Sequence, residues 1–323
     1  MNSSPQRCAR KPLLAMVASI AMPGLGQLYN GQATKGLVFA FLGLGLLVPV
    51  SAWIALHGPE RLLWLSACIG VLITVCLYLY TIIDAFRTAK RIGENYTLQP
   101  FNRSYIYILV FIFGYFFVYN DLASYTRERL MESFWIPSQS MLPNILHGDL
   151  ILADKRVNCL GCKYRVQRGD LAILISPNDR TKLYIKRIIG LPGDQIEIVQ
   201  TQVRVNGQSI VKERLQSAND EGHITLLEHG DKGDYPVIWQ QHSKHREDYA
   251  LTVPNGHVYV LGDNRDAAHD SRFIGPIPLM DVVGKAKQIW LSYDREAGAV
   301  RWERVGLMVD SNREEDKRSG DEP

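Results

Sequence analysis

Cysteine and histidine are scarce in this chain, which limits the metal sites and disulfides that it can form. The 323 residues include five cysteines and eight histidines. Cys159 and Cys162 form a Cys-x-x-Cys pair, and in an oxidising compartment such a pair predicts a local disulfide, with free thiols as the alternative. A zinc site would need a second pair of ligands, and neither His147 nor His223 is spaced to provide it. We therefore expect no metal.

Charge is low overall and is missing from long stretches of the first half. The formal net charge of +3 is too small to indicate nucleic acid as a partner. Three runs contain no charged side chain, at residues 37–56, 62–83 and 105–120. Each approaches or reaches the roughly 20 residues that a helix needs to cross a bilayer. A weaker run at residues 13–29 is interrupted by Pro23 and Gly24, and it either spans or lies re-entrant.

These runs predict a membrane domain at residues 13–120, which follows a short basic tail at residues 1–12. We expect three or four helices, over residues 13–29, 37–56, 62–84 and 104–120. Basic residues cluster between the last two runs, and loops of this kind stay in the cytoplasm; they are Arg87, Lys90, Arg91 and Arg103. The last helix would then deliver the rest of the chain to the outer face of the cytoplasmic membrane. Basic residues near the N-terminus fit three crossings better than four, so the number of crossings stays open.

The second half, at residues 121–309, changes from helical to strand-like patterning. Short apolar or alternating runs lie between turn signals and predict strands; they cover residues 150–153, 171–175, 183–189, 195–199, 202–205, 257–261 and 288–291. No stretch sustains an amphipathic helix, so we expect a mostly β domain. Residues 211–256 are polar and resemble an insertion, and the charged tail at 310–323 is predicted to be disordered.

Two residues of this half could act together as the nucleophile and the base of a hydrolase. Ser140 follows the last apolar run, and Lys186 comes 46 residues later inside an apolar segment. A serine hydroxyl is a weak nucleophile until a base takes its proton, and a lysine can be that base only when its amine is neutral. Burial favours the neutral amine, and Ile185 and Ile188 are apolar neighbours. Taken alone, the serine also fits a turn, and the lysine fits a strand edge from which its amine reaches water.

Four segments resemble, in order, the motifs of bacterial signal peptidase I, the leader peptidase family. They are Pro137 to Pro143 with Gly148-Asp149 downstream, Arg168-Gly169-Asp170, Tyr184 to Asp194, and Gly262 to Arg272. One such match can arise by chance, but four in family order are specific. Separately, residues 23–32 resemble the turn of the small two-helix membrane modules known as TM2-type domains, which implies a packing role and no chemistry.

The signal peptidase resemblance implies an activity and a set of roles. It implies a membrane-anchored endopeptidase that removes signal peptides from exported preproteins, prefers small side chains before the cut and needs no cofactor. Ser140 would be the nucleophile and Lys186 the general base, with the main chain of Ser140 and the hydroxyl of Ser138 as oxyanion donors. The remaining motif residues would shape or support the site: Met141, Asp263, Asn264, Arg265, and a paired Asp270 and Arg272.

The sequence departs from the family pattern at two positions. Asn144 stands where the family usually has threonine, and Ala268 stands where it usually has a serine whose hydroxyl orients the catalytic lysine. Without that hydroxyl, the side chains of Asn264 or Ser271, or a water molecule, are the candidates for orienting the amine of Lys186.

Three alternatives follow from these features. His147 or His269 could in principle serve as the base, although neither occupies a matched functional position. A specialised relative that matures a narrow set of substrates, or a catalytically weak membrane scaffold, would also fit the alanine at position 268. Apart from preproteins and the lipid bilayer, which residues 134–136 could touch through their aromatic side chains, the sequence indicates no partner and leaves the oligomeric state open.

Overall fold

The computed structural model describes residues 7–46, 63–94, 96–157, 165–216, 222–241 and 248–309. The chain divides into two compact units, at Met1–Glu128 and Arg129–Pro323. Cys159 and Cys162 lie outside the described residues, as do the predicted disordered tail and residues 47–56 of the second predicted helix.

The described part of the first unit is built of helices. They are α1 (Pro12–Ala21), α2 (Leu25–Tyr29), α3 (Ala33–Ala40) with a π-helical continuation (Phe41–Leu46), α5 (Leu63–Ile92), α6 (Ser104–Ile112) with a π-helical continuation (Phe113–Tyr119), and α7 (Asn120–Arg129). Two stretches are long and apolar enough to cross a membrane, Cys68–Ile92 and Ser104–Arg129. The weaker apolar run at residues 13–29 forms the two short helices α1 and α2, because Pro23 and a left-handed Gly24 (φ 89°) separate them.

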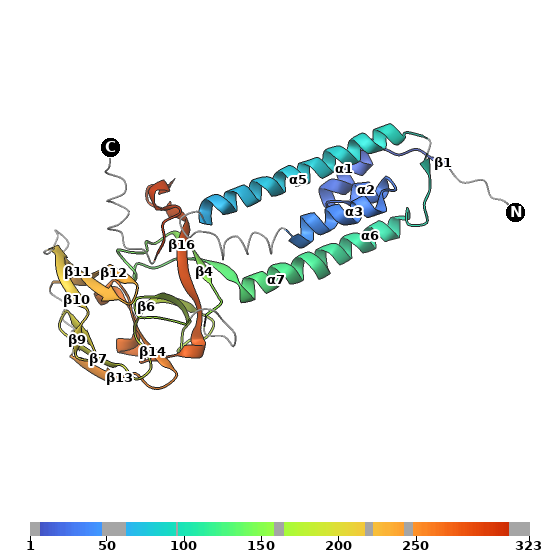
Figure 1. Ribbon diagram of the computed structural model, residues 1–323. Helices are drawn as coiled ribbons and strands as arrows, with labels where there is room; N and C mark the ends of the chain where they lie inside the picture. The colour runs from blue at the N-terminus through green and yellow to red at the C-terminus, as the bar shows by residue number, and fades with distance from the viewer. Residues whose placement is uncertain are drawn as a thin grey trace. The chain divides into compact units, whose positions relative to one another are not determined.

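The helical unit buries polar side chains beside a small apolar core, and it exposes many apolar side chains on its surface. The fully buried amide of Gln27 donates to Thr81 O at 2.8 Å and to the carboxylate of Asp84 at 3.0 Å. Lys35 reaches the same carboxylate at 2.7 Å. The outward faces of α1 and α5 expose leucine, isoleucine and valine side chains, such as Leu13 at 65%. In Figure 1, α5 runs alongside α1, and the short β1 (Arg7–Cys8) pairs with β2 (Tyr96–Thr97).

The second unit is mostly β. Its strands are β3 (Met131–Trp135), β4 (Asp149–Asp154), β5 (Leu171–Ile175), β6 (Leu183–Gly190), β7 (Gln195–Val199), β8 (Gln202–Val205), β9 (Gln208–Ser209), β10 (Val211–Gln216), β11 (His223–Gly230), β12 (Gly233–Gln240), β13 (Tyr249–Thr252), β14 (His257–Leu261), β15 (Ile277–Pro278), β16 (Val282–Asp294) and β17 (Ala299–Val300). A four-residue helix, α8 (Ser271–Ile274), follows β14. The prediction of N-terminal apolar helices followed by a mostly β domain is confirmed.

The largest sheet carries the two segments on which the Ser/Lys hypothesis depends. Its order is β15-β14-β6-β5-β16-β4-β3, with β17 added to β16. The long β16 spans this sheet and pairs with both β4 and β5 (Figure 1). Strand β6 lies between β5 and β14, so Lys186 stands in the middle of the sheet. The loop from β3 to β4, at residues 136–148, contains Ser140 and is called the serine loop below.

Residues 211–256, which the sequence left without assigned structure, contain further strands. β10, β11 and β12 form a three-stranded antiparallel sheet, and β13 joins β7, β8 and β9. Alternate side chains of β12 are buried, namely Tyr235, Val237 and Trp239. Pro236 stands between two of these buried residues, and proline normally argues against a strand. It is accommodated because β12 is an edge strand of its sheet.

Candidate active site

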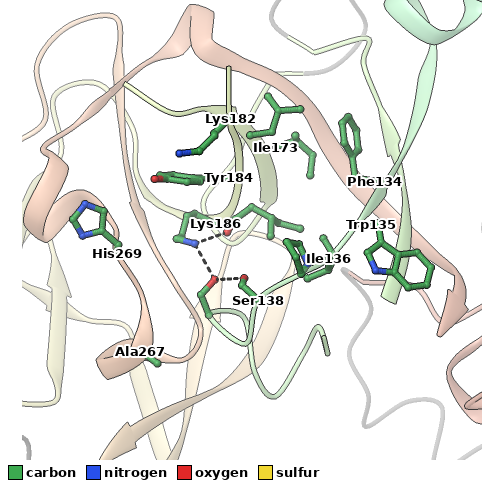
Figure 2. Close-up of a pocket in the computed structure, with 14 residues that line it drawn as sticks. Phe134, Trp135, Ile136, Ser138, Ile173, Lys182, Tyr184, Lys186, Ala267 and His269 are labelled. Atoms are coloured by element: carbon green, nitrogen blue, oxygen red, sulfur yellow. Dashed lines mark hydrogen bonds between the residues drawn. The ribbon is translucent and has the colours of Figure 1, made fainter. Parts of the chain in front are cut away.

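The fold brings Ser140 and Lys186 together. Lys186 Nζ lies 3.0 Å from Ser140 Oγ, and Ser138 Oγ lies 3.2 Å from the same oxygen. Figure 2 shows these groups converging from the loop after β3 and from strand β6. A serine hydroxyl within hydrogen-bond reach of an amine is the geometry that nucleophile activation requires. Ser138, the predicted oxyanion donor, lies beside the hydroxyl of Ser140.

Lys186 is buried without a negative partner. Its side chain is 5% exposed, and among the described residues no carboxylate lies within ion-pair distance of its amine. Burial lowers the pKa of Lys186 to about 8, against the opposing fields of Asp270 and Asp263. Burial disfavours the ammonium form because a low-dielectric surrounding solvates charge poorly. The amine is therefore partly neutral near neutral pH, which a general base needs.

The amine of Lys186 is oriented by the main chain. Nζ donates to the carbonyl of Ile185 at 2.9 Å. Neither side chain that the sequence suggested as an orienter contacts it: Asn264 donates to Gln139 O at 3.2 Å, and the hydroxyl of Ser271 accepts from the amide of Val260 at 3.0 Å. That expectation was wrong for both residues, because each side chain is used to hold backbone.

The turn after β14 holds the serine loop by its backbone. The amide of Asn264 donates to the carbonyl of Ser140 at 3.1 Å. Gly262 lies so close that a Cβ atom there would stand 2.7 Å from the same carbonyl oxygen and would also collide with Ala268. A side chain at position 262 would thus push the serine loop away from the turn, and only glycine fits.

The predicted supporting residues form buried ion pairs around the site. Asp270 pairs with Arg272 through two bonds of 2.8 Å and caps α8. Asp263 pairs with Arg187, the residue after the candidate base, through bonds of 2.7 and 2.6 Å. Arg265 is fully buried against Glu228. Each pair joins different elements or closes a turn. The pairs of Asp270 and Asp263 are bidentate, and bidentate arginine–carboxylate bonds fix orientation as well as distance.

A pocket of about 490 Å³ opens beside the two candidate catalytic groups. Its wall is mostly apolar, and it is lined by Phe134, Trp135, Ile136, Pro137, Ser138, Ser140, Ile173, Lys182, Leu183, Tyr184, Ile185, Lys186, Ala267 and His269 (Figure 2). Residues 134–136 all line the pocket but differ in exposure: Ile136 is buried, whereas Trp135 is 39% exposed.

Among the described residues, neither Met141 nor the two candidate histidines, His147 and His269, hydrogen-bond the reacting atoms. Met141 is fully buried in a core cluster with Ile145 rather than in the pocket wall. His269 lines the pocket, where its ring stacks on Phe273 at 5.5 Å. Within the described part of the chain, Ser140 Oγ is bonded by Lys186 and Ser138 and by no histidine.

Two arginines near the end of the described chain also bond the serine loop, and no sequence motif predicted them. Arg304 donates to the carbonyl of Asn144 at 3.0 Å and to the carboxylate of Asp149 at 2.6 Å. Arg301 donates to the carbonyl of His147 at 3.1 Å. The contacts span about 155 positions of sequence, so local patterning carries no signal for them.

Comparison with known proteins identifies the family. The profile described as signal peptidase, peptidase S26 matches residues 106–291, more than half of the chain. A signal peptidase I from Pseudomonas aeruginosa is 33% identical over 208 residues, which are 56% of this chain and 73% of that protein. A signal peptidase I from Buchnera aphidicola is 29% identical over 243 residues, with 56% and 76% covered.

A solved structure was also matched. The signal peptidase I of Enterococcus faecalis is 28% identical and covers 38% of this chain and 97% of its own, with a TM-score of 0.29. A TM-score this low does not establish a common fold, so the assignment rests on the sequence matches. The chain belongs to the signal peptidase, peptidase S26 family.

Proposed function

We propose that the protein is a membrane-anchored serine endopeptidase that cleaves N-terminal signal peptides from exported preproteins. The observation that carries the proposal is the 3.0 Å separation between Ser140 Oγ and the buried amine of Lys186. The two apolar helices support the membrane anchor. The relatives named signal peptidase I support the substrate class. The basic residues at the C-terminal end of α5, together with Arg103 before α6, favour a catalytic unit outside the cytoplasm.

The reaction begins when the neutral amine of Lys186 takes the hydroxyl proton as Ser140 Oγ attacks the scissile carbonyl carbon. The ammonium so formed then gives its proton to the nitrogen of the leaving amine, and the peptide bond breaks. Lys186 next takes a proton from water as the water oxygen attacks the acyl-enzyme ester. The ammonium gives that proton to Ser140 Oγ as the ester bond breaks, which releases the signal peptide and restores the serine hydroxyl. With a pKa of about 8, roughly one tenth of the amine is neutral at pH 7, so the rate should rise with pH until the amine is fully neutral.

The main-chain amide of Ser140 and the hydroxyl of Ser138 would donate to the oxyanion. Ser138 can turn from Ser140 Oγ to the oxyanion as the tetrahedral carbon forms, and such donors typically contribute about 3 kcal/mol of transition-state stabilisation. The apolar pocket would take the residues before the cut. Its aromatic and branched walls favour small side chains at the position next to Ser140, because larger groups clash there.

A cleavage assay tests the proposal. The full chain in liposomes should cleave a preprotein, and Ser140→Ala and Lys186→Ala should each lose roughly 10³-fold or more in rate, because members of a catalytic unit act together. Ser209→Ala and Lys212→Ala are matched controls, since both side chains are exposed on the strands β9 and β10, and they should cleave normally. Normal cleavage by Lys186→Ala would refute the base assignment, and no cleavage by the unmodified chain would refute the function.

A panel of unrelated preproteins separates a general signal peptidase from a specialised relative. Cleavage of most of the panel supports the general enzyme. Cleavage of one substrate alone would instead favour the specialised form.

A further inference from the structure

Asn144 makes a set of contacts that no motif assigns. Its side-chain nitrogen donates to the carbonyl of Pro236 at 2.8 Å and to the carboxylate of Asp263 at 2.7 Å. A side-chain amide has two N–H donors, so both are used, whereas a threonine hydroxyl has only one. The asparagine that departs from the family pattern therefore joins two partners at once.

The carboxylate partner, Asp263, connects Asn144 to the strand that holds the candidate base. The carboxylate of Asp263 is completely buried, and both of its oxygens accept from Arg187. Arg187 follows Lys186 on β6, and its guanidinium also donates to the carbonyl of Gly169 at 2.6 Å. A continuous set of hydrogen bonds thus runs from the serine loop through Asn144 and Asp263 to the strand that holds the base.

The carbonyl partner, Pro236, connects Asn144 to residues 211–256, the polar segment whose role the sequence did not indicate. Pro236 belongs to β12, and two residues further along this strand the amide of Ile238 donates to the carbonyl of Asp263 at 2.9 Å. Tyr235 of the same strand lies under the guanidinium of Arg187 at 3.9 Å. The β11–β12 hairpin therefore supports the same acid–arginine pair that Asn144 contacts.

We propose that Asn144 is a positioning residue, whose amide joins the serine loop, strand β12 and the Asp263–Arg187 pair and so holds Ser140 at attack distance from Lys186. This inference rests on the proposed function. A serine displaced by even a fraction of an ångström from the amine leaves the near-attack geometry on which proximity catalysis depends. The effect should therefore fall on the chemical step and leave substrate binding in the pocket unchanged.

The variants Asn144→Ala and Asn144→Thr test the two-donor role. Asn144→Ala should lower kcat at least tenfold with KM within about twofold of the unmodified chain. Asn144→Thr keeps one donor, so its kcat should lie between those of Asn144→Ala and the unmodified chain. The control is Asn206→Ala, because the amide of Asn206 also donates to a carboxylate, that of Asp194 at 2.9 Å, in the turn after β8. That control should lose thermal stability and keep its kcat.

The pH profile gives a readout that a merely structural role would not move. The amide of Asn144 partly offsets the charge of Asp263, and a negative charge near Lys186 favours its ammonium form. Asn144→Ala should shift the acid limb of the rate profile to higher pH, and Asn144→Asp, if it folds, should shift it further. Asp270, whose field acts on the same amine, is unchanged in all variants.

A second probe separates this inference from the substrate assignment. Acetylation of Ser140 by p-nitrophenyl acetate, with Ser140→Ala as the blank, requires the nucleophile and base but no preprotein. If the chain acetylates Ser140 but cleaves no preprotein, the proposed substrate is wrong. The acetylation rates of the variants then still test the positioning role of Asn144. Slower acetylation in Asn144→Ala than in Asn206→Ala supports the positioning role. Equal rates, or a raised KM with an unchanged kcat, would overturn it.

Discussion

The helical and β units both bury charged side chains, but the partners of their buried cations differ. In the helical unit, the buried Arg10 lies over the rings of Tyr29 and Tyr96, at 4.5 and 3.9 Å from their centroids. In the helical unit, the carboxylate of Asp84 accepts from both Lys35 and Gln27. In the β unit, the described buried cations are Lys186, Arg187, Arg265, Lys285 and Arg304. All of them except Lys186 pair with a carboxylate, namely Asp263, Glu228, Asp170 and Asp149.

Burial alone does not distinguish the candidate base, Lys186, from a lysine held in an ion pair. Lys285 is buried to the same extent as Lys186, at 5% exposure each, yet its amine lies 2.6 Å from Asp170. An ion pair keeps a buried amine charged, whereas an unpaired buried amine loses its proton more readily. The unpaired amine is thermodynamically costly, and the chain retains it next to Ser140.

The largest expected effect comes from replacing each of these two lysines by methionine. Lys285→Met should destabilise the protein by roughly 3 kcal/mol, because it removes a partner of the buried Asp170. Lys186→Met should abolish cleavage yet raise stability at pH 7 by about 1–3 kcal/mol, because a depressed lysine pKa is a cost to folding. Thermal unfolding of the full chain in detergent measures both.

The pH dependence of the Lys186→Met effect has a definite sign. The amine has a pKa of about 8 in the folded protein and 10.5 otherwise. Between these values the unfolded chain binds a proton that the folded chain does not, so the unmodified protein gains stability as pH rises. The advantage of Lys186→Met should be full below pH 8 and should shrink toward pH 10.5. A variant less stable than the unmodified protein at pH 7 would contradict the comparison.

Much of the fold could be predicted from the sequence because its signals are local. The strands at 171–175, 195–199, 202–205 and 257–261 coincide with β5, β7, β8 and β14, since alternation and turn residues are read within a few positions. The Ser/Lys hypothesis needed the motif order as well, because 46 residues separate a loop serine from a strand lysine that touch only in the folded chain.

What could not be predicted depends on long-range contacts or on main-chain groups. Asn144 and Asp263 are 119 positions apart, and the support from Arg304 reaches across 160 positions to the carbonyl of Asn144. The orientation of Lys186 by the Ile185 carbonyl is a main-chain contact, which side-chain identity does not encode. For the hydroxyl missing at Ala268, the sequence suggested Asn264, Ser271 or a water molecule as replacements, and the two side chains hydrogen-bond backbone groups instead.

A smaller effect is expected from the paired charge of the helical unit. Asp84→Asn removes the negative partner of Lys35 and should lower the stability of the full chain in detergent by about 1–2 kcal/mol. Asp121→Asn is the matched control, because Asp121 is exposed on α7, and its change should stay within about 0.5 kcal/mol. The acetylation rate of Ser140 should be unchanged in both. A stability equal to that of the control would mean that this pair, unlike those of the β unit, contributes nothing.

The smallest effect is expected from Ala268→Ser, which restores the hydroxyl usual in the family. The amine of Lys186 already bonds Ser140 Oγ and the Ile185 carbonyl, so a third partner should change kcat by less than about threefold, under 1 kcal/mol. The acid limb of the pH–rate profile should move little, because a neutral hydroxyl adds no charge beside the amine. Ala250→Ser on the exposed face of β13 controls for the added hydroxyl. A gain of tenfold or more in kcat would mean that the Ile185 carbonyl orients the amine poorly. The unpaired Lys186 of the β unit would then lack a partner that holds its amine in the reactive geometry.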